Sequence, residues 1–331
     1  MPERLTYPYT RGVISGRPRF EPSGFDEGAP GGTPGVGYRS KYPMLDVAFV
    51  GHFARDRLVI AGVAEAASGG GVYYGSMAVR RLGHSVAVIT RLHPDDFPYL
   101  EELRREGIIV YAAPAPQTTG IENIYPDRTM DRRICHPMGS AGPFTAADLP
   151  AVEARVTIVT PLMAGEVSGD LVRLLTARGP IGLDVQGFAR VPEGDTLVTR
   201  DWPGKRADLA GVTYLKADDA EAEVLTGLTD LRKAARAFAD LGPREVVLTH
   251  AGGVLVFAEG TFHEARFTPR EVRGRTGRGD TTFATYIATR LEADPEYACR
   301  FAAAVVSLKI ERPGPYRGSR GDAEKFLRAN G

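Results

Sequence analysis

The chain is poor in the residues that mark disulfide-rich, metal-binding or membrane proteins. Its 331 residues include two cysteines, Cys135 and Cys299, which lie far apart and lack the spacing of a metal site. No apolar run reaches the roughly 18 residues of a membrane-spanning helix, and we find no secretory signal. These absences exclude a disulfide scaffold, and they predict a cytoplasmic protein without a membrane partner.

An excess of charge of one sign is also lacking, because 41 lysines and arginines balance 41 aspartates and glutamates. A balanced chain has no general field that would attract nucleic acid or an anionic bilayer. We therefore expect no nucleic-acid partner, and any recognition of phosphate must depend on a local arrangement of residues.

The first part of the chain differs in composition from the rest. Residues 1–44 contain eight glycines and seven prolines without helical or strand periodicity, which predicts a flexible leader. From residue 45 to 331, buried strands such as "LDVAFVG" and "SVAVIT" alternate with helices such as "VYYGSMAVRRLG". This alternation predicts an α/β domain with three layers, α/β/α, around a mostly parallel sheet.

Two segments depart from this alternation. Residues 117–136 predict a hairpin with "PD" at its turn, which is an antiparallel excursion from the main sheet. In "DRLVIAGVAEAASGGG", beginning at Asp56, we expect an edge strand followed by a glycine-rich loop. The hairpin of residues 117–136 could act as a flap that covers a site.

The segment "GRTGRGDTTF", Gly274–Phe283, places glycines beside a carboxylate at the start of an expected helix. Glycines let backbone N–H groups approach a ligand closely, and the start of a helix is electrically positive. The segment therefore predicts an anion-binding site. Taken alone, Asp280 is more simply explained as a helix cap.

Three motifs in a fixed order resemble the ribokinase family of sugar and nucleoside kinases, also called the PfkB family. "TGRGD" (Thr276–Asp280) resembles its "TGAGD" loop, Gly70-Gly71 its double glycine, and "KADDAE" its "NxxE" element with Asp218 in place of asparagine. The resemblance spans about Val47 to Arg328 and implies a ribokinase-like fold with a small β lid near residues 56–66 and 117–136. Stretches such as "VGHFARDRLVI", "DVQGFAR" and "SLKIERPGPYRG" are most similar to the myo-inositol kinase branch.

The resemblance implies roles in phosphoryl transfer for the residues of the "TGRGD" loop. Asp280 would be the catalytic base, and the N–H groups of Gly277, Arg278 and Gly279 would form the anion hole. Thr276 would contribute to the cofactor site. Arg278 stands where the family has alanine, so its guanidinium either contacts phosphate or points into solvent.

The "KADDAE" element would complete the cofactor site with Lys216, Asp218 and Glu221. By the resemblance the donor would be ATP with Mg²⁺, and Asp218 and Glu221 would bind the metal through water. Their simpler explanation is favourable negative charge in a first helical turn.

The substrate would be a small sugar or cyclic polyol. Asp56 would accept hydrogen bonds from substrate hydroxyls beside Gly70 and Gly71. Gln186 and Arg190 would reach the site from the carboxyl end of a central strand, although both are equally explained as ordinary loop residues.

The sequence thus predicts an ATP-dependent kinase for a sugar or cyclic polyol, with myo-inositol as the favoured acceptor. The alternatives are a nucleoside kinase of the same family and a non-catalytic descendant that senses a sugar or nucleotide. A homodimer through the lid is the expected assembly, because such contacts are common in the family.

Overall fold

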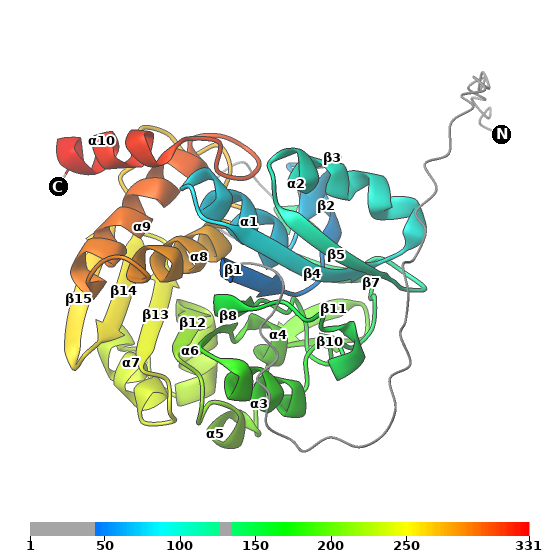
Figure 1. Ribbon diagram of the computed structural model, residues 1–331, viewed down its shortest axis with the longest axis horizontal. Helices are drawn as coiled ribbons and strands as arrows, with labels where there is room; N and C mark the ends of the chain where they lie inside the picture. The colour runs from blue at the N-terminus through cyan, green and yellow to red at the C-terminus, as the bar shows by residue number, and fades with distance from the viewer. Residues whose placement is uncertain (1–43, 126–133, 331) are drawn as a thin grey trace, which may run out of the picture. The chain divides into compact units, whose positions relative to one another are not determined.

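The structure is a computed structural model that describes residues 44–125 and 134–330. Its central feature is a nine-stranded sheet (Figure 1). In spatial order its strands are β15 (Thr261–Arg266), β14 (Gly253–Ala258), β13 (Glu245–His250), β12 (Tyr214–Asp218), β9 (Ile181–Asp184), β8 (Ala154–Val159), β1 (Leu45–Val50), β4 (Val86–Leu92) and β5 (Ile109–Pro114). From β13 to β5 all neighbours are parallel, whereas β14 and β15 add antiparallel strands at one edge. The predicted mostly parallel sheet is confirmed.

Helices cover both faces of this sheet, which confirms the three layers. Figure 1 shows one set on one face and a second set on the other. The first set comprises α1 (Gly71–Arg81), α8 (Arg278–Arg290), α9 (Pro295–Ile310) and α10 (Arg320–Asn330). The second comprises α3 (Gly169–Arg178), α6 (Asp219–Thr226) and α7 (Leu231–Ala239). Short helical turns complete the chain: η1 (Pro94–Leu100), α2 (Glu101–Arg105), η2 (Ala146–Asp148), α4 (Gln186–Ala189) and α5 (Lys205–Asp208).

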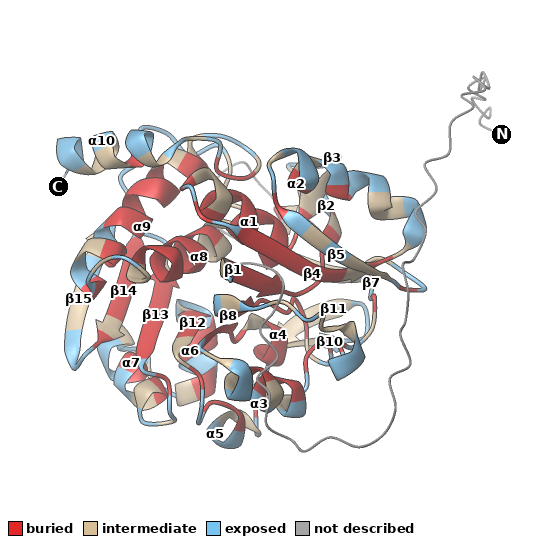
Figure 2. Ribbon diagram, in the orientation of Figure 1, coloured by how far each residue is buried: buried red, intermediate tan, exposed pale blue. Residues whose placement is uncertain are grey.

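The central strands are mostly apolar in their middle residues because helices bury both of their faces. Val47 and Phe49 of β1 belong to one core cluster, whereas Ala48 and Val50 belong to a second. Figure 2 shows this burial along the middle of the sheet. Alternate side chains of one strand therefore hold the two helical layers to the sheet.

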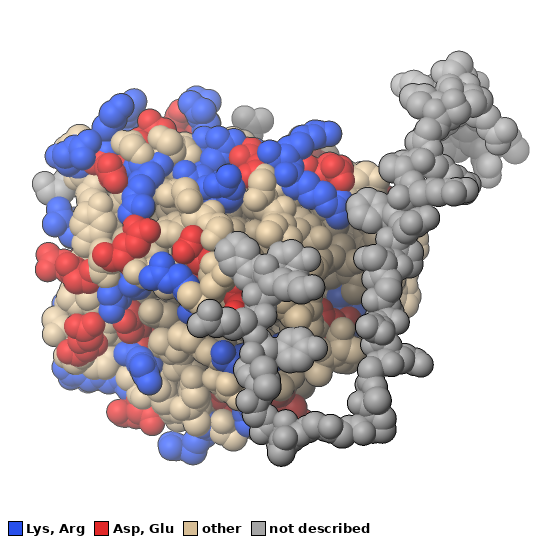
Figure 3. All heavy atoms as spheres, viewed as in Figure 1, with Lys and Arg blue, Asp and Glu red and all other residues tan. Residues whose placement is uncertain are grey.

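The surface matches the balanced composition. Acidic and basic side chains are interspersed on the face shown in Figure 3. Among the described residues, none of the helices has both the length and the apolar character needed to cross a bilayer.

A second sheet of four strands has the order β3 (Val63–Gly69), β2 (Ala54–Ile60), β6 (Gly120–Tyr125) and β7 (Ile134–Gly139). The expected hairpin is present, because β6 and β7 are antiparallel; its "PD" turn lies outside the described residues. Where the sequence predicted one edge strand followed by a glycine-rich loop, the structure has two paired strands, β2 and β3, before the double glycine. Residues 63–69 pair with β2 across a tight turn at Ala61 and Gly62, whose φ angles are 48° and 83°.

A small hairpin follows α4 and was not expected from the sequence. It consists of β10 (Arg190–Glu193) and β11 (Thr196–Thr199), and β11 packs beside β7. The hairpin thus links the region after β9 to the lid, by which we mean the four-stranded sheet.

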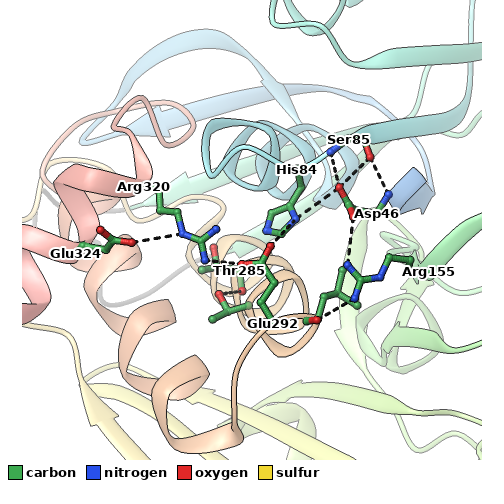
Figure 4. A network of polar contacts seen from close by, with 10 residues as sticks. Asp46, His84, Ser85, Arg155, Thr285, Glu292, Arg320 and Glu324 are labelled. Carbon is green, nitrogen blue, oxygen red and sulfur yellow. Dashed lines mark hydrogen bonds and ion pairs between the residues drawn. The ribbon is translucent and has the colours of Figure 1, made fainter. Parts of the chain in front are cut away.

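Polar contacts join several elements at the amino ends of the central strands (Figure 4). Ser85 donates to Asp46 Oδ2 from both its N–H and its hydroxyl at 2.9 Å, and Arg155 Nη1 donates to Asp46 Oδ1 at 3.4 Å. His84 Nδ1 lies 3.7 Å from Asp46 and 3.9 Å from Glu292. Burial lowers the pKa of His84 despite these carboxylates. These residues supply hydrogen-bond and charge partners to one another, so their contacts stabilise the fold at this edge of the sheet.

Candidate active site

The carboxyl ends of β9 and β12 carry several of the predicted site residues, among them Gln186, Lys216 and Asp218. The chain changes its direction across the sheet between β1 and β8, and ligands of open α/β sheets bind at such a switch point. The start of α8 reaches the same edge. A Cβ atom added to Gly279 would lie 3.3 Å from Lys216 Cε and 3.8 Å from Thr249 Oγ1. The structure therefore brings "TGRGD" and "KADDAE" together, as the resemblance implied.

Helix α8 begins directly after Gly277, whose φ of 76° is left-handed. A Cβ atom at this position would come within 2.1 Å of the Tyr74 ring, so only glycine fits here. Asp280 is the third residue of the helix and is half-buried. Burial raises the pKa of Asp280, while the positive charges of Lys216, Arg190 and Lys309 act against that rise. The carboxylate thus lies at a positive helix end among three cations.

Lys216 on β12 is 4% exposed and lies between two buried carboxylates. Its Nζ donates to Asp184 Oδ1 at 3.1 Å and to Glu221 Oε2 at 3.3 Å. Burial lowers the pKa of Lys216, but the carboxylates, led by Asp184, outweigh burial and raise it above its usual value. Burial also raises the pKa of Glu221, to about 7. The lysine is therefore a permanent positive charge beneath the start of α8.

Asp218 and Glu221 form a capping box at the start of α6. Asp218 Oδ1 accepts from the Glu221 N–H and Glu221 Oε2 accepts from the Asp218 N–H, each at 2.8 Å. In each of these two carboxylates, one oxygen therefore has the role of a helix cap, as the simpler explanation predicted. The hydrogen bonds of the capping box leave one oxygen of each carboxylate for another partner. Among the described residues, no three His, Cys, Asp or Glu side chains form a direct metal cluster.

Gln186 and Arg190 belong to the same constellation. The Gln186 N–H donates to Asp184 Oδ1, and Arg190 Nη2 donates to Gln186 Oε1, both at 2.9 Å. Arg190 also acts on the charges of Asp280 and Glu221. These two residues are thus held in place at the site rather than on a free loop.

The predicted acceptor residues lie between β2 and α1. Asp56 Oδ1 accepts from the Ile121 N–H at 3.0 Å. Cβ atoms added to Gly70 and Gly71 would lie 2.4 Å from His52 O and 2.5 Å from Thr160 Cβ. The double glycine therefore allows the start of α1 to approach the ends of β1 and β8.

Tyr74 connects this acceptor region to α8. Burial raises the pKa of its hydroxyl well above the usual value, and the negative charges of Asp56 and Asp280 contribute further. Its ring packs against Gly277. Tyr74 is 3% exposed, so it belongs to the core between α1 and α8.

Arg278 does not simply extend into solvent. Its Nη1 lies 3.5 Å from Ala251 O, and its guanidinium is 5.8 Å from the centre of the Phe267 ring. The Arg278 N–H donates to Arg275 O at 3.1 Å, so this amide of the expected anion hole already has an acceptor. The described residues offer no acceptor to the amides of Gly277 and Gly279.

Sequence reasoning missed Lys309 near the end of α9. Its Nζ donates to Gly274 O at 2.9 Å and to Thr276 O, which are the carbonyls just before the start of α8. A single lysine in the apolar run "RFAAAVVSLKI" was the available signal, because a buried lysine requires partners.

The start of α8 combines the Asp280 carboxylate with backbone amides and nearby cations. Asp56, a second carboxylate, is suited to bind hydroxyls. Together these are the parts of a kinase site. The protein is a phosphotransferase that acts on the hydroxyl groups of sugars or nucleosides. The chain belongs to the pfkB family of carbohydrate kinases, which matches residues 65–320.

Solved structures refine this assignment. One is described as a pyrophosphate-dependent kinase in the ribokinase family with a pyrophosphate analog and myo-inositol; it is 39% identical, with a TM-score of 0.79 over 84% of this chain and 99% of that chain. A sulfate complex of a pyrophosphate-dependent kinase of this family is 40% identical, with the same TM-score and coverage. A curated relative, cytidine kinase of Thermococcus kodakarensis, is 27% identical over 81% of this chain and 95% of its own length. The predicted ribokinase-like fold and the likeness to myo-inositol kinases are confirmed.

Proposed function

We propose that the protein transfers a phosphoryl group from pyrophosphate to a hydroxyl of a cyclic polyol, with myo-inositol as the favoured acceptor. The observation that carries this proposal is the position of Asp280, half-buried at the start of α8 among Lys216, Arg190 and Lys309. The similarity to solved myo-inositol kinases supports the choice of acceptor.

In the proposed reaction, the polyol hydroxyl loses its proton to Asp280 as its oxygen bonds to the terminal phosphorus of the donor. The bond from that phosphorus to the bridging oxygen breaks, and inorganic phosphate leaves with the electron pair. Burial raises the pKa of the Asp280 carboxyl, which makes the carboxylate a stronger base. Asp56 would orient the acceptor by accepting from neighbouring hydroxyls.

The donor would bind at the start of α8. The amides of Gly277 and Gly279 would donate to the transferred phosphoryl group, with Lys216 beneath them as a fixed positive charge. Asp218 and Glu221 would hold Mg²⁺ through water molecules, and the bound metal would neutralise charge on the donor phosphates.

The choice of pyrophosphate departs from the ATP donor expected from the sequence. The segment before Asp280 contains four arginines, at positions 270, 273, 275 and 278, and such a density suits a donor that consists only of phosphate. The guanidinium of Arg278 also lies against Phe267, an aromatic face on which an adenine could otherwise stack. The similar structures described as pyrophosphate-dependent support the same donor.

The two alternative functions expected from the sequence, a nucleoside kinase and a non-catalytic sensor, stay predictions. A nucleoside kinase is favoured by the similarity to cytidine kinase, and a non-catalytic sensor is opposed by the retained Asp280. A cytoplasmic location stays a prediction from the sequence.

The direct test is phosphorus NMR of reactions that contain myo-inositol or cytidine with Mg²⁺ and either pyrophosphate or ATP. We expect a myo-inositol phosphate, with kcat/KM for pyrophosphate at least about 100-fold above that for ATP. A preference for ATP would refute the donor, and phosphorylation of cytidine alone would favour the nucleoside kinase. Absence of product with retained ligand binding would favour the sensor.

The role of Arg278 in donor choice has its own test. Arg278→Ala should raise the KM for pyrophosphate about tenfold. It should thereby lower the ratio of kcat/KM for pyrophosphate to kcat/KM for ATP. Arg206→Ala, which removes an exposed arginine of α5, is the matched control. An unchanged donor preference in Arg278→Ala would refute this role.

A further inference from the structure

Lys309 is the buried cation that the proposed mechanism leaves without a task. It is 2% exposed, and its Nζ donates to Gly274 O at 2.9 Å and to Thr276 O. Both carbonyls lie in the short segment that leads from the end of β15 to α8. An ammonium group held by backbone carbonyls has the surroundings of a bound monovalent cation.

The peptide geometry links this contact to the anion hole. In a trans peptide, C=O and N–H point in opposite directions, and every peptide bond between the described residues is trans. Thr276 O points at Lys309, so the N–H of Gly277, in the same peptide, points away from Lys309. Gly274 O also points at Lys309, so the N–H of Arg275 points away from it as well. Both amides therefore point to the side of the segment away from Lys309, which is the side where our proposal puts the donor phosphate.

The charge of Lys309 is sensitive to its neighbours. Burial lowers its pKa to about 7; Asp280 on α8 acts to raise it and Arg278 on α8 lowers it further. From α1, the ring of Tyr74 has its centre 5.2 Å from Nζ. An anion bound on the other side of the segment would favour the protonated lysine.

We propose that Lys309 is a positioning residue that serves as the built-in monovalent cation of the phosphate-binding segment, holding the carbonyls of Gly274 and Thr276 so that the following amides face the donor. This inference rests on the proposed function. It predicts that donor binding weakens when the ammonium is removed, and that a small free cation can replace it.

The first test compares Lys309→Ala with Lys325→Ala, which removes an exposed lysine of α10. We expect the KM for pyrophosphate to rise about ten- to a hundredfold in Lys309→Ala, with a smaller change in kcat, since a charge-assisted contact is lost. Ammonium chloride should restore much of the affinity, whereas tetramethylammonium chloride at equal concentration, too large for the vacated space, should not. Wild type and Lys325→Ala should respond to neither salt.

The second test uses pH. Because the protonated lysine favours the anion, kcat/KM for pyrophosphate in the wild type should fall as the pH rises through about 7. The Lys309→Ala variant should lack this fall. A residue needed only for folding would change neither the pH profile nor the response to ammonium.

The outcomes separate this inference from the proposed function. Lys309→Met removes the charge but keeps most of the side-chain volume, so it serves as a second variant if Lys309→Ala does not fold. Urea unfolding measures the stability of Lys309→Met. An active wild type together with a Lys309→Met or Lys309→Ala variant of unchanged KM would overturn the role of Lys309 alone. A wild type that neither turns over nor binds pyrophosphate, measured through the fluorescence of Trp202, would overturn both.

Discussion

At the scale of single residues, the centre of the site is a buried cluster whose charges depend on one lysine. Lys216 lies within 3.3 Å of oxygens from both Asp184 and Glu221, and all three side chains are buried. Buried carboxylates are costly when they lose their cation. The same lysine that would support the anion hole is therefore needed for stability.

Lys216→Met tests this dependence. Removal of the charge leaves two buried carboxylates without their cation, so we expect a loss of about 3–5 kcal/mol in the free energy of unfolding. Urea denaturation at pH 7 measures it. Lys233→Met, at an exposed position of α7, should change the stability by less than about 0.5 kcal/mol. Equal stability of the two variants would contradict this account of the cluster.

At the scale of elements, the start of α8 is the feature that the sequence predicted best. Its glycines, its aspartate and the following helix are all visible in "GRTGRGDTTF", because local backbone preferences decide them. The packing of Gly277 against Tyr74 was not predictable, since it depends on how α1 lies beside α8.

Gly277→Ala should separate backbone strain from this packing. Gly227 at the end of α6 has a similar φ of 72°, but a Cβ atom there would meet nothing within 4 Å. Gly227→Ala should therefore cost only the strain, about 1–2 kcal/mol. In Gly277→Ala the clash with Tyr74 should add about 1–3 kcal/mol. Thermal unfolding of both variants checks the difference, and equal losses would show that the packing is unimportant.

The elements that sequence reasoning missed share a physical cause. Residues 63–69, "VAEAASG", contain one β-branched residue, Val63, and no aromatic residue, so their strand propensity is weak and pairing with β2 decides their structure. Lys309 was missed because its carbonyl partners lie 33 and 35 residues away in the sequence. Tertiary contacts, rather than local conformational preference, determine the strand at residues 63–69 and the partners of Lys309.

At the scale of the whole molecule, the order of the strands brings distant segments together. Asp56, Asp184, Asp218 and Asp280 come from four parts of the chain, and the parallel sheet places two of them, Asp184 and Asp218, at the carboxyl ends of β9 and β12. The alternation of strands and helices predicted this sheet, because it is a pattern of burial. The sequence predicted which residues belong to the candidate site, and it remains a prediction; the hydrogen bonds between these residues could be known only from the fold.

The lid offers one free edge for assembly among the described residues. Strand β7 has β11 beside it, whereas β3 ends the sheet and exposes Val63 by 71%. Such an edge favours pairing with a second chain, so we keep the homodimer as a prediction.

Val63→Lys should convert this dimer to a monomer, because charge on an edge strand opposes pairing. Light scattering after size-exclusion chromatography measures the mass. Ile109→Lys, on the edge strand β5, is the control and should leave the dimer intact. A monomeric wild type, or a dimer that survives Val63→Lys, would contradict this assembly.

The central claim is that Asp280 is the base of a polyol kinase, and Asp280→Asn tests it most directly. The rate of phosphate release from pyrophosphate in the presence of myo-inositol should fall about a hundred- to ten-thousand-fold, because asparagine cannot accept the proton. Asp219→Asn, at an exposed position of α6, should keep the wild-type rate. Pyrophosphate binding and the unfolding midpoint of Asp280→Asn should stay close to wild type. A normal rate in Asp280→Asn would contradict the account.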